Sequence, residues 1–144
     1  MFRLATLAFA ALLAAVPAAH AQADVAADVG VVMSYRLYSV GAMDYCYDEI
    51  EKRQAFKDAS AAWQERNAEA VLAASTLLPK VAKAEEIAAM VVQVRNSIAF
   101  DIAGEADKVA ACQRFADNLN DASSDIAARA PDSVARIKAA VAAQ

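Results

Sequence analysis

Histidine is almost absent from this 144-residue chain, in which His20 is the single example. His20 lies in an N-terminal segment that we expect to be removed, so the mature protein would contain no imidazole. Ser-His-Asp and Cys-His sites need an imidazole base, zinc hydrolases usually bind their metal through histidine, and di-iron bundles use Glu-x-x-His pairs. The sequence therefore predicts none of these sites.

Glycine is also scarce, with three residues in the whole chain. The sequence has no G-x-x-x-x-G-K-[ST], no G-x-G-x-x-G and no G-x-S-x-G motif. It also lacks the C-x-x-C-H motif that attaches a c-type haem. We therefore expect no catalytic residues, no cofactor and no metal, and a protein that is not an enzyme.

The chain lacks a run of the roughly 20 apolar residues that a helix needs to cross a bilayer. A shorter apolar run, residues 4–16, follows Arg3 and is followed by Pro17 and the tripeptide Ala-His-Ala at 19–21. A basic residue, a short apolar stretch and an A-x-A site are the parts of a secretory signal peptide. We predict a signal peptide at residues 1–21, cleavage after Ala21, and no membrane anchor in the mature protein.

The remaining residues, 22–144, have the length of one domain with a single core. The formal charge of the full chain is −4, and loss of Arg3 with the signal makes it more negative. Binding to phosphate backbones or to anionic lipid needs clustered Lys and Arg. We therefore expect no nucleic-acid partner, and a location in the periplasm of a Gram-negative host or outside the cell.

The chain has two cysteines, Cys46 and Cys112, and an exported protein meets an oxidising environment in which such a pair usually forms a disulfide. A redox-active pair is the alternative. Catalytic dithiols usually lie close together in sequence, with neighbours that stabilise the thiolate, whereas the acids Asp44 and Asp48 flank Cys46. We predict a structural disulfide that contributes roughly 4 kcal/mol by restricting the unfolded chain.

Few glycines and prolines, many alanines and no alternating β-branched pattern predict an all-α protein. Apolar residues recur at helical spacing in four main segments and one short C-terminal segment. The expected helices cover residues 24–50, 54–77, 79–103, a fourth from about 105 that breaks among 118–124, and 133–142. Successive amphipathic helices with short joins favour a small antiparallel bundle with one disulfide.

Two features decide how these helices would meet. Gly41 lies inside the first helix, where it marks a bend, a break or a close crossing with another helix. Cys46, late in the first helix, must reach Cys112, early in the fourth, which predicts that these two helices are antiparallel neighbours. The residues expected to be buried include Trp63 and Asn67 in the second helix, Val91, Val94 and Phe100 in the third, and Val109 in the fourth.

All four tyrosines lie within residues 33–49. On a helix, Tyr35, Tyr38 and Tyr45 would form a second face beside the core stripe, which contains Tyr47. Packing is one interpretation, because tyrosine fills space and keeps its hydroxyl in water. A contact patch is the other, because tyrosine is enriched at protein interfaces. The first three are therefore candidate contact residues, which we expect to be more exposed than Tyr47.

The sequence favours a small exported protein that binds another envelope or secreted protein without catalysis, and it leaves the oligomeric state open. Two alternatives remain. Acids cluster at residues 44–51 and 85–86, and an envelope enzyme could use two inward carboxyls of raised pKa in a deep pocket. A carrier of a small ligand would need an apolar cavity, which close packing of alanine-rich helices disfavours.

Overall fold

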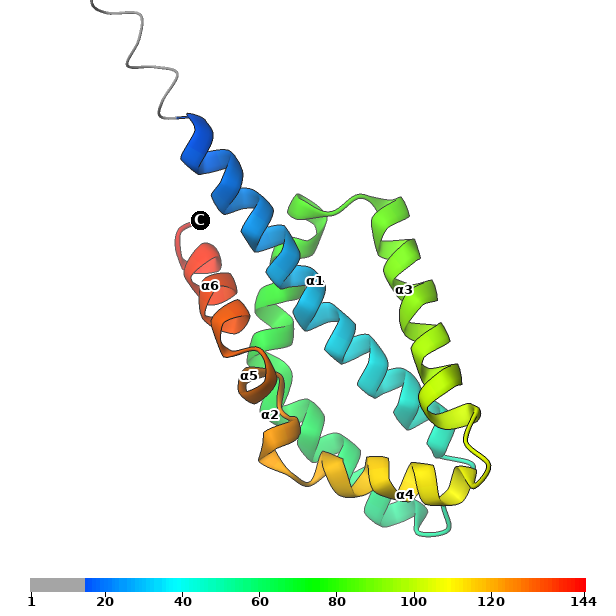
Figure 1. Cartoon of the computed structure of the whole chain (residues 1–144). Coiled ribbons are helices and arrows are strands. Elements are labelled where there is room, and N and C mark those ends of the chain that lie inside the picture. The colour runs from blue at the N-terminus through cyan, green and yellow to red at the C-terminus, as the bar shows by residue number, and fades with distance from the viewer. Residues whose placement is uncertain (1–14) are drawn as a thin grey trace, which may run out of the picture.

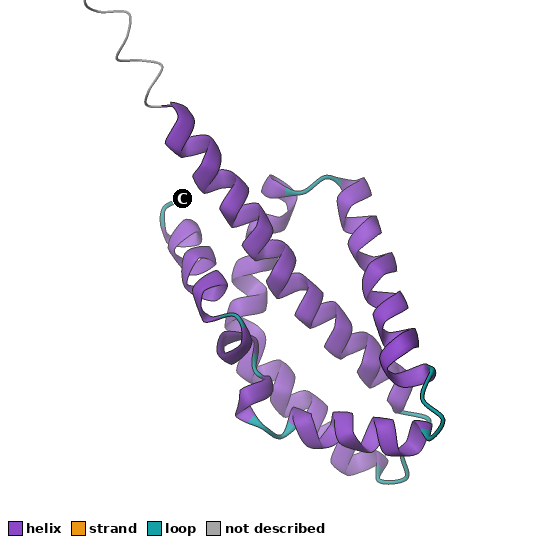
Figure 2. Cartoon of the chain, viewed as in Figure 1, coloured by secondary structure: helices purple, strands orange, loops and turns teal. Residues whose placement is uncertain are grey.

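A computed structural model describes the backbone of residues 15–144 and the side chains of residues 24–144. Residues 1–14 of the predicted signal peptide, and the side chains of its remainder, lie outside this description, so cleavage after Ala21 stays a prediction. The described residues are mostly helical and contain no strand (Figures 1 and 2). The predicted all-α class is confirmed.

The helices follow one another through short joins, as the periodicity predicts. In chain order the elements are α1 (Ala15–Cys46), α2 (Arg53–Val81), α3 (Ala84–Ile98), the π-helical turn η1 (Ala99–Ala103), α4 (Lys108–Leu119), the 3-10 turn η2 (Ala122–Ser124), α5 (Ile126–Arg129) and α6 (Pro131–Ala142).

Helix α1 lies at the centre of the bundle. Helices α2 and α6 pack against it and against each other, and α3 packs against it on the opposite side from α6 (Figure 1). Helix α4 crosses one end of the bundle, because the chain turns by 115° between the α3–η1 segment and α4. The predicted antiparallel alignment of the first and fourth helices is therefore wrong, and α6 takes the place beside α1 that the prediction gave to α4.

The disulfide between Cys46 and Cys112 is present despite this different topology. It joins the last residue of α1 to the first half of α4, with the two Cα atoms 5.3 Å apart and both side chains fully buried. A crossing of two helix ends brings two cysteines together as well as an antiparallel alignment does. The disulfide therefore fixes which residues of α1 and α4 lie side by side. It does not determine the angle between the two helices.

Gly41 marks a close helix crossing, and α1 continues through it without a break. A Cβ atom placed on Gly41 would lie 2.6 Å from the Cδ1 atom of Ile98 in α3. The absence of a side chain at this position lets α3 approach α1 closely. Of the three possibilities for this glycine, the structure selects the crossing.

Helix α2 packs as its periodicity predicts, and its buried residues include Phe56, Trp63, Asn67 and Leu77. The amide of Asn67 is satisfied within this core, as a buried polar group requires. Its Nδ2 donates to the carbonyl of Trp63 at 2.8 Å, and its Oδ1 accepts from the N–H of Ile126 at 2.7 Å. Asn67 thus connects α2 to the first residue of α5.

The third helix begins later than predicted. Pro79 lies in the last turn of α2, which continues to Val81, and α3 starts at Ala84. Proline removes one backbone donor and is costly in a helix interior, but α2 ends two residues later. The N–H of Lys83 donates to the carboxylate of Glu86 at 2.7 Å, which supports the actual start of α3.

Helix α4 buries fewer residues than predicted. Cys112, Ala116 and Leu119 are buried as predicted, but Val109 is 49% exposed. This helix crosses the end of the bundle and buries a narrow strip rather than a wide face. The predicted break after it is present, because η2 and α5 replace a continuous helix over residues 120–129.

An ion pair between a buried carboxylate and a half-exposed arginine fastens α6 to α1. Asp28 is buried, and its two carboxylate oxygens accept hydrogen bonds from the Nε and Nη2 atoms of Arg136, each at 2.7 Å. The hydroxyl of Ser133 donates to the same carboxylate at 2.8 Å. The hydrogen bonds from Arg136, and then that from Ser133, hold the pKa of Asp28 below its ordinary value despite burial.

We predict that Asp28→Asn lowers the free energy of unfolding by about 1.5–3 kcal/mol, the range for hydrogen bonds to charged groups. Because the folded-state pKa of Asp28 is lowered, this contribution is present above the unfolded-state value of about 4 and is lost as the pH falls below it. Urea unfolding of both proteins across the acid range measures the difference. The exposed acid Asp44, changed to asparagine, is the control, and a pH-independent difference for Asp28→Asn would contradict the assignment.

Candidate functional site

Helix α3 is covered on one side only. Val94 is the one buried residue of α3, and Ile102 in η1 is the next buried residue along the chain. The predicted core residues Val91 and Phe100 are 38% and 84% exposed. These two predictions are wrong because α3 packs against α1 alone along most of its length, so only a narrow strip of α3 is buried.

The π-helical turn η1 contributes to this arrangement. It directs Ile102 into the core while Phe100, two residues earlier, stays almost fully in water. Turns of this kind are rare and occur frequently at functional sites. Phe100 is the most exposed of the large hydrophobic side chains described, so its position is the first indication of an interaction surface.

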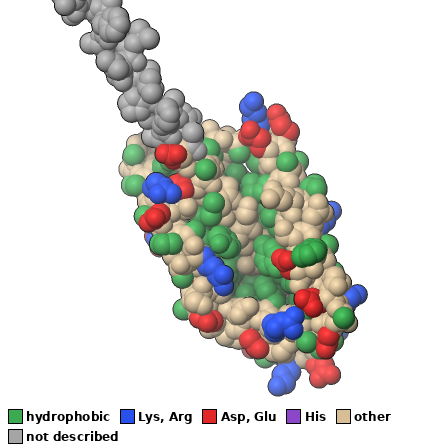
Figure 3. Space-filling model, in the orientation of Figure 1, with side chains coloured by type: hydrophobic (Ala, Val, Ile, Leu, Met, Phe, Trp, Pro, Cys, Tyr) green, Lys and Arg blue, Asp and Glu red, His purple; other side chains and the backbone are tan. Residues whose placement is uncertain are grey.

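Apolar side chains gather in a hollow between α1 and α3 (Figure 3). The groove there, which we call the tyrosine groove, has a volume of about 650 Å³. Its residues are Ala27, Gly30, Val31, Ser34, Tyr35 and Tyr38 of α1 and Gln93, Val94 and Ser97 of α3. Small residues on α1 keep the groove open, since a Cβ on Gly30 would meet no atom within 4 Å.

Tyr38 closes one end of the groove. Its hydroxyl donates to the carboxylate of Asp101 in η1 at 3.2 Å, which connects α1 to the end of α3. Burial, followed by the negative charge of Asp101, raises the pKa of Tyr38 to about 12. The phenol therefore stays protonated at physiological pH and serves as a hydrogen-bond donor.

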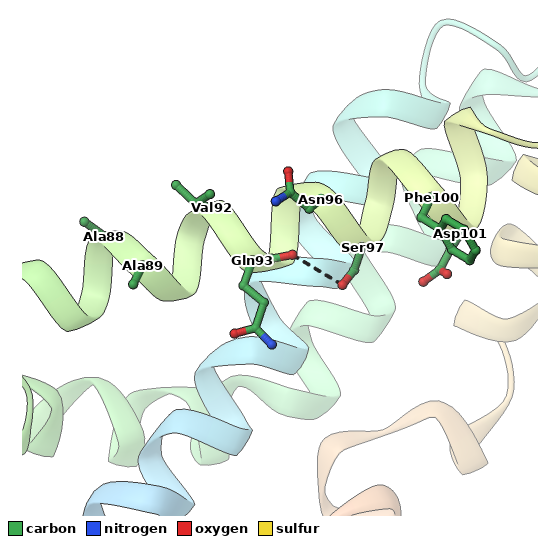
Figure 4. Close-up of a pocket in the computed structure, with 8 residues that line it drawn as sticks. All are labelled: Ala88, Ala89, Val92, Gln93, Asn96, Ser97, Phe100 and Asp101. Carbon is green, nitrogen blue, oxygen red and sulfur yellow. Dashed lines mark hydrogen bonds between the residues drawn. The ribbon is translucent and has the colours of Figure 1, made fainter.

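A second surface lies on the outer side of α3 and continues the tyrosine groove. We call it the Phe100 face, and it consists of Ala88, Ala89, Val92, Gln93, Asn96, Ser97, Phe100 and Asp101 (Figure 4). All eight residues come from α3 and η1, and the hydroxyl of Ser97 donates to the carbonyl of Gln93 at 3.3 Å. Gln93 and Ser97 line both surfaces, so groove and face form one continuous area.

The candidate tyrosines do not all lie in one groove. Tyr35 and Tyr38 line the tyrosine groove, whereas Tyr45 lines a smaller groove of about 380 Å³ with Gly41 and Ile98. Tyr35 is exposed, but Tyr38 and Tyr45 are half-buried, as Tyr47 is. The expected difference in exposure is thus clear for Tyr35 alone.

Tyr47 packs against the core, as its predicted place on the core stripe requires, although it follows the end of α1. The cationic ends of Arg53 and Lys57 lie 5.5 and 5.1 Å from its ring centre. Cations over an aromatic face are attracted by its quadrupole. Tyr47 therefore packs under the start of α2 and contributes to the join between these helices.

The candidate contact residues predicted from the sequence all lie on the first helix, and none lies on the third. Val92 and Phe100 are the most exposed large apolar side chains of α3 and η1, at 58% and 84%. Both lie away from the stripe through Val94 and Ile98. Apolar residues outside the main stripe of a helix are the signal in the sequence for such exposed positions, but Phe100 was predicted to belong to a wider core.

Acidic residues do not gather around these surfaces. Asp101, on the Phe100 face, is the one acid among the residues that line this face, the tyrosine groove and the smaller groove. Among residues whose side chains the structure describes, no group of three or more His, Cys, Asp or Glu could hold a metal ion. Within the same part of the chain no single helix is long and apolar enough to span a membrane, and α3 with η1 and α4 meet that test only as a strongly bent pair.

We predict that Gly30→Ala raises the free energy of unfolding by about 0.8–1 kcal/mol, because alanine is the better helix former by that amount and space is open at this position. Gly41→Ala is the matched change in the same helix and should stabilise less, because the new methyl displaces the end of Ile98. Urea unfolding of both variants measures the two values. Equal stabilisation by the two changes would contradict the close crossing at Gly41.

Comparison with known proteins assigns no family to this chain. No protein-family model, curated protein or solved structure matches it. A helical bundle by itself does not specify an activity. Function is therefore inferred from the tyrosine groove and the Phe100 face.

Proposed function

We propose that the mature protein is an exported, non-catalytic binding module that holds a segment of another envelope or secreted protein in the tyrosine groove. The observation that carries the proposal is an open groove of about 650 Å³ whose exposed apolar residues, Val31 and Tyr35, have no covering helix. Contiguous apolar surface of this kind is typical of interaction sites.

The shape of the groove favours an amphipathic helix as the bound segment. Two helices, α1 and α3, form its walls, and the small residues Ala27, Gly30 and Ser34 leave space between them. A helix that lays its apolar side into such a groove is a common mode of recognition. Tyr35 would supply a rigid aromatic contact, and Gln93 would offer amide donors and acceptors at the edge.

Export is supported by the disulfide between Cys46 and Cys112, because disulfides persist in oxidising compartments. The predicted signal peptide at residues 1–21 agrees with this location. In the periplasm or outside the cell, a small domain gains stability from the disulfide. A stable scaffold under these conditions is suited to presenting a binding surface.

The two alternatives receive less support from the geometry. An enzyme that uses two carboxylates would place them face to face in a pocket, whereas no acid lines the tyrosine groove and Asp101, the one acid of the Phe100 face, is hydrogen-bonded to Tyr38. A carrier would enclose its ligand, whereas the tyrosine groove, the smaller groove and the Phe100 face are all open to the surface. Binding of a protein segment fits an open, apolar groove better.

The proposal is tested by replacing Tyr35 with a photo-reactive phenylalanine analogue in cells that export the protein. We expect a covalent adduct with one defined protein after irradiation. Gly30→Arg in the same chain should abolish the adduct, because the new side chain extends into the groove from a position with free space. Gel electrophoresis and mass spectrometry identify the adduct.

Leu72 on α2 provides the matched control, since it is 68% exposed and lies outside the groove. The photo-reactive group at Leu72 should give no such adduct, and Leu72→Arg should leave the adduct at Tyr35 unchanged. Identical adducts from both positions, or an adduct at Tyr35 that survives Gly30→Arg, would refute the role of the groove.

A further inference from the structure

We propose that the smaller groove between α1 and α3 binds a small amphipathic molecule that has an aliphatic tail and a single carboxylate. This inference goes beyond the binding of a protein segment in the tyrosine groove and does not depend on it. The smaller groove has a volume of about 380 Å³, which lies within the range of roughly 300–1,000 Å³ that is typical of small-molecule sites. Its volume therefore fits one small ligand.

The walls of the smaller groove are almost entirely apolar. They are formed by two rows of residues at spacings of four, Leu37, Gly41 and Tyr45 on α1 and Val91, Arg95 and Ala99 on α3 and η1. Residues four apart lie on the same side of a helix, so each row follows the length of the groove. Among the described residues that line it, Arg95 and Tyr45 alone carry polar side-chain atoms. An aliphatic tail would therefore contact apolar surface on both walls.

The smaller groove and the tyrosine groove lie on opposite sides of the strip where α3 meets α1. Val94, the buried residue of this strip, lines both grooves. Gln93 and Ser97 line the tyrosine groove, whereas Arg95 lines the smaller groove. At 3.6 residues per turn, the first two point to one side of Val94 and Arg95 to the other. The two grooves can therefore bind different molecules.

Arg95 supplies the one charge at the smaller groove. No acid lines this groove, and the residues three and four positions from Arg95 on its helix, at 91, 92, 98 and 99, are all apolar. In the described part of the chain the ion pairs involve the cations Arg66, Arg114, Arg136 and Lys138, and none involves Arg95. The guanidinium is therefore free to pair with a carboxylate that the ligand brings.

The chemistry of arginine and tyrosine selects the charged end of the ligand. A guanidinium donates two parallel N–H groups to one carboxylate, while its aliphatic stem lies along apolar surface. Arg95 is exposed, so its charged end is accessible from water. A ligand with two negative charges would keep one of them unbalanced beside a protein of net charge −4. The hydroxyl of Tyr45 offers a further, neutral donor in the same groove.

Nuclear magnetic resonance titration of the oxidised mature protein with decanoate, below its micelle concentration, tests the proposal. We expect saturable shifts at the amide of Gly41, which lines the smaller groove, and none at Gly30, which lines the tyrosine groove. Decanol has the same tail without the charge and should bind at least tenfold more weakly. Gly30→Arg should leave decanoate binding unchanged, because it blocks the other groove.

Substitutions at Arg95 test the role of its charge. Arg95→Gln should weaken decanoate binding by about 10- to 100-fold, the loss expected for hydrogen bonds to a charged group, and should leave decanol binding unchanged. Arg95→Glu should bind decyltrimethylammonium in place of decanoate. Arg114→Gln on α4 is the matched control, since Arg114 is also exposed and lies outside the groove. Circular dichroism confirms that each variant folds.

Three outcomes would overturn the proposal: no saturable shift at Gly41, equal affinity for decanoate and decanol, or decanoate binding that Arg95→Gln leaves unchanged. The photo-crosslinking result at Tyr35 is independent of them. A protein that forms the adduct but does not bind decanoate retains the function proposed for the tyrosine groove and loses the ligand site. Binding of decanoate without an adduct would show the reverse.

Discussion

The close crossing of α1 and α3 at Gly41 is the contact on which the surface features depend. Gly41 lets the side chain of Ile98 approach α1, and Val94 fills the strip beside it. Helix α3 is held at this strip and, through η1, at Tyr38. Since its other sides have no helix against them, the tyrosine groove and the Phe100 face both stay open. A wider contact would have buried the same apolar residues in the core.

The rest of the fold provides a firm support for this helix. The disulfide holds the end of α1 to α4, Asn67 ties α2 to α5, and Asp28 fastens α6 to α1. The disulfide, Asn67 and the carboxylate of Asp28 are buried, and both polar groups are satisfied by specific partners, which is the condition under which polar groups stabilise a core. The bundle can therefore present one lightly packed helix without losing its overall structure.

Local chemistry explains what could be predicted from the sequence. The periodic stripe through Trp63 and the pairing of Cys46 with Cys112 follow from residue types and spacing. The exposure of Phe100 does not, because periodicity identifies an apolar side of a helix but not whether another helix covers it. The direction of α4 and the contact of Asp28 with Arg136 likewise depend on tertiary packing between distant segments. Of the residues that line the tyrosine groove, Tyr35 and Tyr38 stand out in composition, whereas Gln93 and Ser97 do not.

Helix α3 is held from one side, and its uncovered sides form the surface that we propose to bind a partner. Hydrogen–deuterium exchange of the oxidised mature protein tests it directly, because exchange resolves local opening from global unfolding. Amides of α3 should exchange through local opening at a lower free energy than those of α1 and α2. Protection of α3 equal to that of α2 would contradict this arrangement.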